Sequence, residues 1–274
     1  MAKRIADLTR ETRVVPGTQP LLKSKHASHT FGWQEEAAKA ETARIGKLLA
    51  ALQYKLYADG RFAVLVVLQA IDGGGKDSTT RHVFSSFNPQ GCTVHSFKVP
   101  SAEELRHDYL WRVHQKVPPR GEIGVFNRSH YEDVLVVRVD SLVPKQQWQR
   151  RYQQINDFEE MLTREGTLIV KFFLQISKDE QRRRFEDRIR DPVKRWKFDA
   201  ADLGKREQWG EYRNAFEEML ANCSTTHAPW HVIPANHEWL RDLAVSQVML
   251  QALQSLPLEY PKPGFDPNRI RVPK

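Results

Sequence analysis

A run of three glycines follows the most apolar segment of the chain. Residues 62–68 form a continuous, valine-rich stretch, which predicts a parallel strand covered on both faces. Gly73, Gly74 and Gly75 come soon after it, and Lys76 follows them directly. The backbone N–H groups of such a loop can surround an anion at the start of the next helix, while the lysine supplies a mobile positive charge. This feature predicts a phosphate-binding loop on an α/β sheet.

The loop departs from the standard P-loop pattern at two positions. Ala70 stands where the first glycine is usual, and Asp77 stands where a serine or threonine usually meets magnesium. A further carboxylate, Asp72, would repel bound phosphate unless a cation lay between them. Mg²⁺ prefers hard oxygen ligands, so Asp72 is a candidate magnesium ligand. The alternative is a glycine-rich turn in which Lys76 is solvated and Asp72 caps the following turn.

Strand-like and helix-like segments alternate along most of the chain. Further strands are expected at 93–99, 122–126, 167–176 and 231–234, judged by their apolar runs. Helices are expected at 34–57, 101–116, 146–164, 206–221 and 238–253, with further helical stretches that begin at Ser129 and Ser177. Capping boxes start two of these helices, at Ser101 with Glu104 and at Ser177 with Glu180. This alternation predicts right-handed crossovers and a parallel sheet.

One domain of residues 31–256 fits the 274-residue length. Residues 1–30 lack a sustained apolar period and form a basic arm, and residues 257–274 form a tail with five prolines that is expected to wrap the surface or a partner subunit. The longest apolar run is too short to cross a membrane, and the arm has no secretory pattern. We therefore expect a cytoplasmic protein, in which Cys92 and Cys223 are free thiols.

The net charge favours a polyanionic partner. The chain has 42 Lys and Arg against 34 Asp and Glu, which gives a formal charge of +8. Nucleic acid, acidic lipid, nucleotides and inorganic phosphate chains are all polyanions, so the charge does not choose among them.

A second polar cluster follows the strand predicted at 122–126. In open α/β sheets, ligands bind beyond the carboxyl ends of the strands, so this cluster is expected to face the same crevice as the glycine loop. Arg128 would pair with phosphate, while Glu132 or Asp133 would ligate metal or hold the nucleotide. The alternative is an ion pair between Arg128 and Asp133 at the start of a helix.

A third cluster is strongly basic. Residues 178–197 contain nine Lys and Arg against five Asp and Glu, and Arg184 and Arg188 share one helix face. Such a helix can be an ordinary solvated surface, but beside a phosphate loop it suggests a lid of about residues 178–205, with Gly204 as a candidate hinge. Trp196 is a packing residue or stacks on an adenine.

The three clusters together resemble the polyphosphate kinase 2 family. The resemblance covers about residues 31–253 and rests on the glycine loop 72–77, the segment 126–133 and the lid pattern. It implies a P-loop kinase-like fold, which is a three-layer α/β/α sandwich with a parallel sheet and a helical lid. Members of the family often assemble as homodimers or homotetramers.

The resemblance also implies roles for individual residues. Asp72, Lys76, Arg128 and Arg188 would be catalytic, with Asp72 and Asp133 as metal ligands. Phosphate would be bound by Gly73, Gly74, Gly75, Lys76, Arg128, Arg184 and Arg188. The nucleotide would be held by Asn127, Glu132, Asp133, Trp196 and Lys197. Asn127 departs from the family pattern, because many members have Asp there, so metal ligation would move to Glu132, Asp133 or a water.

The implied activity is a reversible phosphoryl transfer between inorganic polyphosphate and AMP or ADP, which gives ADP or ATP. It would require Mg²⁺, with Mn²⁺ as an alternative. The sequence Tyr131-Glu132-Asp133 resembles the subgroup that uses both AMP and ADP. Two rival functions are an ATP-dependent nucleoside monophosphate kinase and a basic nucleic-acid-binding module. If the chain belongs to this family, we expect neither a nucleic-acid nor a membrane partner.

Overall fold

A five-stranded parallel sheet forms the centre of the computed structural model, which describes residues 7–266 and 269–273. Its strands lie in the order β2–β3–β1–β4–β5, and every neighbouring pair is parallel. Their bounds are β1 (Ala63–Gln69), β2 (Cys92–Ser96), β3 (Ile123–Asn127), β4 (Thr167–Gln175) and β5 (Trp230–Pro234). The central strand β1 is buried along its whole length. This arrangement confirms the predicted parallel sheet.

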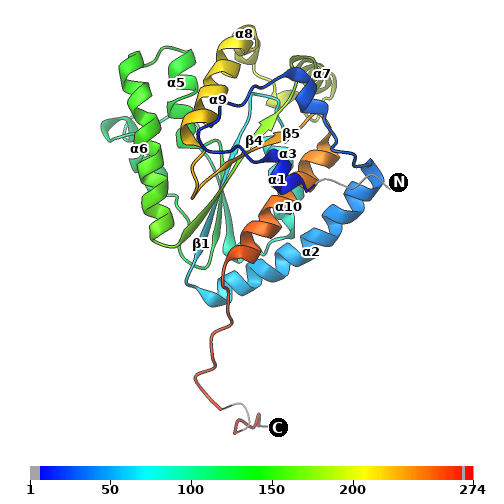
Figure 1. Ribbon diagram of the computed structural model, residues 1–274, viewed down its shortest axis with the longest axis vertical. Coiled ribbons are helices and arrows are strands. Elements are labelled where there is room, and N and C mark those ends of the chain that lie inside the picture. The colour runs from blue at the N-terminus through cyan, green and yellow to red at the C-terminus, as the bar shows by residue number, and fades with distance from the viewer. Residues whose placement is uncertain (1–6, 267–268, 274) are drawn as a thin grey trace.

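Helices cover both faces of the sheet (Figure 1). One face packs against α2 (Glu35–Asp59), α3 (Lys76–Val83) and α10 (Glu238–Ser255). The other face packs against α5 (Val136–Val139), α6 (Lys145–Arg164) and α9 (Trp209–Cys223). Alternate residues of β1 enter the two cores, because successive side chains of a strand point to opposite faces. The predicted three-layer α/β/α sandwich is therefore confirmed.

The remaining elements are short or belong to the predicted lid. The α-helices are α1 (Leu8–Thr12), α4 (Trp111–His114), α7 (Lys178–Arg190) and α8 (Ala201–Glu207). The 3₁₀ turns are η1 (Ser24–Ser28), η2 (Phe84–Ser86), η3 (Pro89–Gly91), η4 (Glu104–Arg106), η5 (His130–Asp133) and η6 (Arg195–Lys197). The lid region 178–205 thus contains α7, η6 and most of α8.

The predicted helix at 101–116 is wrong. The capping box at its start forms, since Glu104 N donates to Ser101 Oγ at 3.2 Å and Ser101 N donates to Glu104 Oε2 at 2.7 Å. The segment nevertheless contains only η4 and α4. The Asp108 carboxylate accepts from the backbone N–H groups of Leu110 and Trp111, which ends the first turn and starts a second one. Leu105, on the expected apolar face, is 70% exposed.

The N-terminal segment packs onto the outer edge of the sheet. Leu8 is fully buried, and Val14 N donates to Trp230 O at 2.8 Å. Arg13 forms an antiparallel bridge with His231, so this segment lies beside β5. The described part of the predicted arm therefore rests on the domain.

The C-terminal tail leaves the domain after α10. Leu258 is buried, and Glu259 N donates to the Asp59 carboxylate at the end of α2. Past Tyr260 the described residues run away from the sheet and do not cover the domain's own surface (Figure 1). The expectation that the tail wraps the surface of its own chain is therefore not met.

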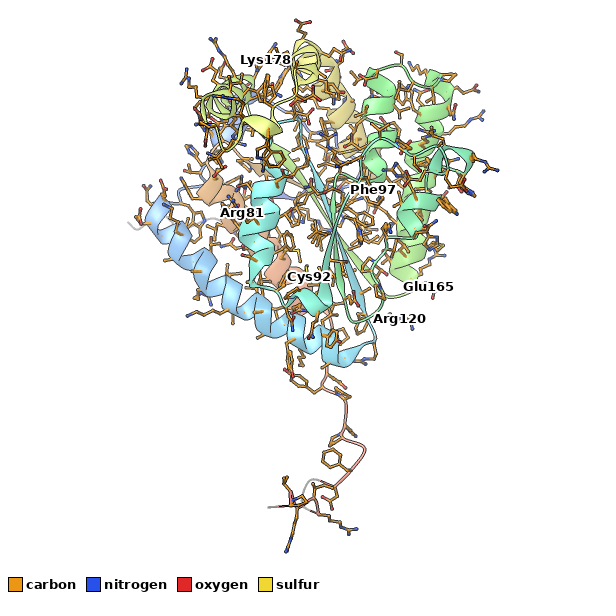
Figure 2. The ribbon with its side chains drawn as sticks, turned by 180° about the vertical axis from the view of Figure 1, so that it is seen from behind. Arg81, Cys92, Phe97, Arg120, Glu165 and Lys178 are labelled. Atoms are coloured by element: carbon orange, nitrogen blue, oxygen red, sulfur yellow. The ribbon has the colours of Figure 1, made fainter. Side chains whose placement is uncertain are left out.

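The loops that precede the strands and the loops that follow them lie at opposite ends of the sheet. Arg120 and Glu165, which precede β3 and β4, lie at one end, while Lys178, which follows β4, lies at the other (Figure 2). The loops after β1, β3 and β4 therefore meet at the carboxyl end of the sheet, where a ligand crevice is expected. Across the described ranges, no helix is both long enough and apolar enough to span a membrane.

Candidate active site

The glycine loop joins β1 to α3 in a turn that side chains would obstruct. Gly73 and Gly75 have φ angles of +80° and +96°, in the left-handed region that favours glycine. A Cβ at Gly74 would lie 2.4 Å from the Ala70 Cβ and 2.7 Å from the Ile71 carbonyl oxygen. The three glycines are thus required by the backbone path. The Gly74 N–H donates to the Ile71 carbonyl oxygen at 2.8 Å, whereas the N–H groups of Gly73 and Gly75 have no hydrogen bond to any residue that the structure describes and can line an anion site.

Lys76 crosses this loop as the first residue of α3. Its Nζ donates to the Ala70 carbonyl oxygen at 2.9 Å, and the side chain is buried. Burial and Arg128 lower the pKa of Lys76, whereas Asp72, Glu132 and Asp77 act in the opposite direction. The ammonium has no second hydrogen bond among the described residues, so it has hydrogens left for phosphate oxygens.

Basic side chains from two other segments form ion pairs with Asp72. Arg128 Nη2 lies 2.6 Å from Asp72 Oδ1, and Lys205 Nζ lies 3.5 Å from Oδ2. Burial raises the pKa of Asp72, but Lys76, Arg128 and Lys205 outweigh it and hold that pKa below its usual value. Asp72 is therefore an ionised carboxylate held among three cations.

Arg128 is fixed by the backbone as well as by Asp72. Its φ angle is +64°, which is uncommon for a residue with a side chain, and its N–H donates to Leu68 O at 3.1 Å. The end of β3 is thereby tied to the end of β1, and the guanidinium is directed toward the glycine loop.

Asn127, the departure from the family pattern, links the same two loops. Its Nδ2 donates to Asp77 Oδ1 at 2.7 Å, and Lys197 of the lid lies 3.7 Å from Asp77 Oδ2. Burial would raise the pKa of Asp77, but the Asn127 bond, Lys197, Lys76 and Arg188 lower it overall. The Asn127 amide thus donates a hydrogen bond to Asp77, which an ionised aspartate at position 127 could not do.

Glu132 and Asp133 face different surroundings. Burial raises the pKa of Glu132, although Arg128 and Lys76 oppose this. When the Gln69 amide is oriented so that both its oxygen and its nitrogen have hydrogen-bond partners, its nitrogen donates to Glu132 Oε1 at 2.9 Å. The structure thus places Glu132 with the phosphate-loop charges.

The Asp133 carboxylate is instead paired with Arg151 of α6, at 2.9 Å. Burial raises the pKa of Asp133 to about 6, against the opposing charges of Arg151 and Arg112. The alternative ion pair between Arg128 and Asp133 is wrong, since each residue has another partner. Arg151 pairs with one oxygen of this carboxylate, and metal ligation by Asp133 stays a prediction.

The two lid arginines lie in unlike positions. Arg184 is buried, and its guanidinium donates to the carbonyl oxygens of Gly73 and Ala235. It therefore holds the glycine loop from outside. Arg188 lies 5.7 Å from the centre of the Phe185 ring, and its charge acts on Asp77. Phosphate binding by these two arginines, and adenine stacking by the 77% exposed Trp196, stay predictions.

Arg241 is a site-supporting residue that the sequence analysis missed. It is fully buried in α10, and its Nη2 donates to Ser78 Oγ at 3.0 Å. Its Nη1 would lie 2.6 Å from a Cβ at Gly75, so the guanidinium lies directly behind the loop. The available signal was an arginine between two leucines, Leu240 and Leu243, on the helix expected at 238–253.

A buried ion pair supports the turn after β3. Lys171 of β4 donates to Glu159 of α6, to Tyr131 Oη at 2.8 Å and to Cys223 O at 2.7 Å, while Tyr131 donates to Glu159. Lys171 and Glu159 are both fully buried. They hold Tyr131, and with it η5. Here the missed signal was a lysine in the middle of an apolar strand.

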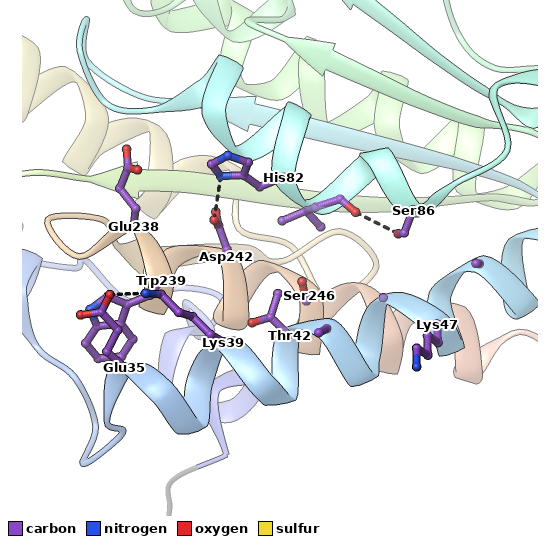
Figure 3. Close-up of a pocket in the computed structure, with 14 residues that line it drawn as sticks. Glu35, Lys39, Thr42, Lys47, His82, Ser86, Glu238, Trp239, Asp242 and Ser246 are labelled. Carbon is purple, nitrogen blue, oxygen red and sulfur yellow. Dashed lines mark hydrogen bonds and ion pairs between the residues drawn. The ribbon is translucent and has the colours of Figure 1, made fainter.

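One cavity lies beside the phosphate loop, and its lining contains no residue of the loop. It has a volume of about 800 Å³ and lies between α2, α3 and α10 (Figure 3). His82 Nδ1 lies 3.1 Å from Asp242 Oδ2 in its wall, and the other oxygen of Asp242 accepts from Arg241. A chain of side chains, from His82 through Asp242 to Arg241, therefore runs from this cavity to the back of the loop.

A magnesium ion fits the donor chemistry of the loop. No group of three or more His, Cys, Asp and Glu gathers in the ranges that the structure describes, so a cage made of protein ligands alone is not present there. Asp72, ionised at the mouth of the glycine loop, supplies one hard oxygen donor, and Asp77 lies nearby on α3. Mg²⁺ is commonly held by one or two carboxylates together with phosphate oxygens and waters.

The chain is similar to known proteins over nearly its whole length. It is 51% identical over 262 residues to AMP/ADP-polyphosphate phosphotransferase of Meiothermus ruber, covering 95% of this chain and 98% of that protein. It is 50% identical over 226 residues to ADP-polyphosphate phosphotransferase of Rhodopseudomonas palustris, covering 78% of each chain. The crystal structure of polyphosphate kinase 2 from Arthrobacter aurescens TC1 matches with a TM-score of 0.91 and 42% identity, over 96% of this chain and 94% of that one.

The P-loop kinase fold expected from the sequence is confirmed by that structural match. The family model of polyphosphate kinase 2 matches residues 32–260, which include the glycine loop, the turn after β3 and the lid. The chain belongs to the polyphosphate kinase 2 family.

Proposed function

We propose that the protein transfers phosphoryl groups between inorganic polyphosphate and adenine nucleotides, converting AMP to ADP and ADP to ATP in a reversible reaction. The observation that carries this proposal is the convergence of Asp72, Lys76 and Arg128 at the carboxyl end of the sheet. The name of the similar protein from Meiothermus ruber supports the same donor and both acceptors, and the name of the one from Rhodopseudomonas palustris supports polyphosphate with ADP.

The site stabilises charge and performs no covalent step. Lys76 and Arg128 would bind the oxygens of the phosphoryl group in flight, which carries negative charge throughout the transfer. The acceptor phosphate of AMP or ADP is itself an anionic nucleophile, so no general base has to remove a proton from it. The backbone N–H groups of Gly73 and Gly75 would orient the donor end, while Gly74 closes the turn with its bond to Ile71.

Magnesium, when bound, would neutralise charge on the phosphate oxygens, and Asp72 is the residue best placed to hold it. Lys205 shares that carboxylate at 3.5 Å. Arg128 also pairs with it at 2.6 Å, so a cation held by Asp72 would be the third positive group on this carboxylate.

The lid supplies positive charge along one side of the site. Lys197 and Lys205 already face the carboxylates of the glycine loop, and Arg188 acts on Asp77. A linear polyanion that lies along these groups would displace many counterions, so its binding should weaken steeply with salt, by analogy with nucleic acids.

Glu132 is the candidate residue for acceptor choice. It lies among the charges of Arg128, Lys76 and Asp72. The family resemblance implies a second subgroup, which uses only nucleoside diphosphates and carries Asn at the Glu132 position. We therefore propose that both AMP and ADP are acceptors. Glu132→Asn should lower activity with AMP more than activity with ADP, and equal losses would remove Glu132 from this role.

A comparison of donors tests the proposed function. The purified protein is supplied with AMP and Mg²⁺, together with either long-chain polyphosphate or ATP at equal phosphoryl concentration. Formation of ADP from polyphosphate supports the proposal. Transfer from ATP alone would assign an ordinary nucleoside monophosphate kinase, and nucleic-acid binding without transfer would assign the binding module.

A further inference from the structure

Tyr212 has a buried hydroxyl group without a partner. It lies in the first turns of α9, directly after the lid, and its ring belongs to the core between the sheet, α6 and α9. The residue is 7% exposed. Its oxygen is shielded from solvent and has no hydrogen bond to any residue that the structure describes.

The charged groups that act on this hydroxyl are largely those of the active site. They are Asp140, which follows α5, then Asp72, Glu132 and Arg128. Burial and the three carboxylates raise the pKa of Tyr212, whereas Arg128 lowers it. The influence is mutual, since the Tyr212 oxygen also acts on Arg128. The hydroxyl therefore keeps its proton and can act as a hydrogen-bond donor beside the phosphate loop.

An unpartnered hydroxyl is costly in a protein interior. Leaving a buried donor unsatisfied costs about 1–3 kcal/mol, and phenylalanine would fill the same space without that cost. Other buried tyrosines of this core are partnered: Tyr131 donates to Glu159 at 2.8 Å, and Arg138 donates to Tyr152 at 3.4 Å. The exception is Tyr212. Ile71, the neighbour of Asp72, packs against the same core, and Lys205 of the preceding helix α8 lies 3.5 Å from Asp72 Oδ2.

We propose that the Tyr212 hydroxyl donates a hydrogen bond to a phosphate oxygen of the substrate bound beside the Asp72–Arg128 pair. The substrate thus supplies the acceptor that the free protein lacks. This inference rests on the proposed function and adds to it a contact from α9, on the side of the site opposite to α3. The phosphate oxygen can belong to the nucleotide or to the polyphosphate end.

The test is Tyr212→Phe, which removes the hydroxyl and keeps the ring. Tyr152→Phe is the matched control, because Tyr152 has the same 7% exposure and lies in the same core, but its hydroxyl faces Arg138. We expect kcat/KM to fall about 10-fold in Tyr212→Phe, as for the loss of one hydrogen bond to a charged group, and to stay near wild type in Tyr152→Phe.

Separate titrations identify which phosphate is contacted. A KM change with AMP and ADP at saturating polyphosphate assigns the nucleotide, and a KM change with polyphosphate assigns the donor. A fall in kcat with both KM values unchanged assigns the phosphoryl group in transfer. Each of these results supports the inference, provided that the thermal midpoint of Tyr212→Phe equals or exceeds that of wild type.

Wild-type kinetics in Tyr212→Phe with all three substrates would overturn the inference. Calorimetric binding of AMP and of inorganic tripolyphosphate by the same two variants adds a readout that does not need turnover. Equal affinities of Tyr212→Phe and wild type for both ligands, together with unchanged kcat, would show that the hydroxyl bonds no substrate. An inactive wild type that binds AMP with a Tyr212-dependent affinity would contradict the proposed reaction and leave the contact supported.

Discussion

Arg128 Nη2 lies 2.6 Å from Asp72 Oδ1, although the two residues are 56 positions apart in the chain. The contact joins the loop after β3 to the loop after β1, which are adjacent parallel strands. Lys205 of the lid approaches the other oxygen of the same carboxylate. One carboxylate thus organises three segments that the sequence keeps far apart.

Removing the charge of Asp72 should abolish most of the activity. Asp72→Asn keeps the size of the side chain but loses its attraction for Arg128, Lys205 and a cation. We expect kcat to fall about 100-fold or more, as for loss of a preorganised charged group, measured as ATP formed from ADP and polyphosphate.

The matched control is Asp187→Asn, on the exposed face of α7. Asp187 pairs with Arg183 at 2.8 Å, away from the loop carboxylates. Its rate should stay within about twofold of wild type, because exposed ion pairs contribute little. Equal rates in the Asp72 and Asp187 variants would remove Asp72 from the catalytic site.

Gly74→Ala should damage both folding and activity. The added Cβ would meet Ala70 and the Ile71 carbonyl at distances that force the loop to move. We expect a loss of about 1–3 kcal/mol in the free energy of unfolding, as for overpacking, and a loss of transfer activity.

Gly204→Ala is the control for the glycine loop. Gly204 lies inside α8 with nothing within 4 Å of its added Cβ, so alanine should stabilise the helix by up to about 1 kcal/mol. Its activity also tests the predicted hinge. A fall in kcat without a fall in the thermal midpoint would assign Gly204 to lid movement, and unchanged kcat would exclude it.

The sequence predicted the parts of the site that depend on local pattern. The glycine loop, Lys76 and Arg128 follow apolar strands directly, and parallel topology brings strand ends together. Partner choice was not predictable in this way. Asp133 pairs with Arg151 of α6, because η5 turns it toward that helix, whereas the neighbouring Glu132 remains with Lys76 and Arg128.

The contacts behind the site depend on tertiary packing. The sequence analysis missed Arg241, Lys171 and Tyr212. Each is a single polar residue in a helix or strand that was predicted from the spacing of its apolar residues. The helix expected at 101–116 failed for a related reason, since Asp108 bonds nearby backbone N–H groups and competes with the helix.

Breaking the buried pair of Lys171 and Glu159 should destabilise the fold strongly. Lys171→Met leaves the Glu159 carboxylate buried without its cation, which costs about 3–5 kcal/mol in the free energy of unfolding. Urea denaturation measures this change.

Two further variants complete that test. Replacing both members, as in Lys171→Met with Glu159→Leu, should recover only part of the loss. No uncompensated charge remains, but the Tyr131 hydroxyl and His130 lose the Glu159 acceptor. Lys39→Met, which removes an exposed ion pair with Glu35, should change stability by less than about 1 kcal/mol. A Lys171→Met variant as stable as Lys39→Met would contradict this account.

Stability should fall as the pH decreases from about 6.5 to about 4. Burial and the charge of Arg13 lower the pKa of His231 to about 4, so the folded protein keeps this imidazole neutral where the unfolded chain protonates it. The unfolded state then binds more protons in this pH range, so the free energy of unfolding decreases by on the order of 3 kcal/mol across it.

His231→Gln identifies the group responsible for this pH dependence. His231 is 5% exposed and its Nδ1 lies 3.0 Å from Thr12 Oγ1, so glutamine keeps a polar contact there without a titrating group. Thermal midpoints of the variant should vary less between these pH values than those of wild type. An unchanged pH profile would assign the effect to other groups.

The most direct test of the account is product analysis with polyphosphate as the only donor. Wild type and Lys76→Met are mixed with Mg²⁺ and long-chain polyphosphate, and with AMP or ADP in separate tubes. We predict ATP from both acceptors with wild type and at least about a 100-fold loss with Lys76→Met. No product from either acceptor with wild type, or equal rates in the two proteins, would contradict the proposed phosphotransfer site.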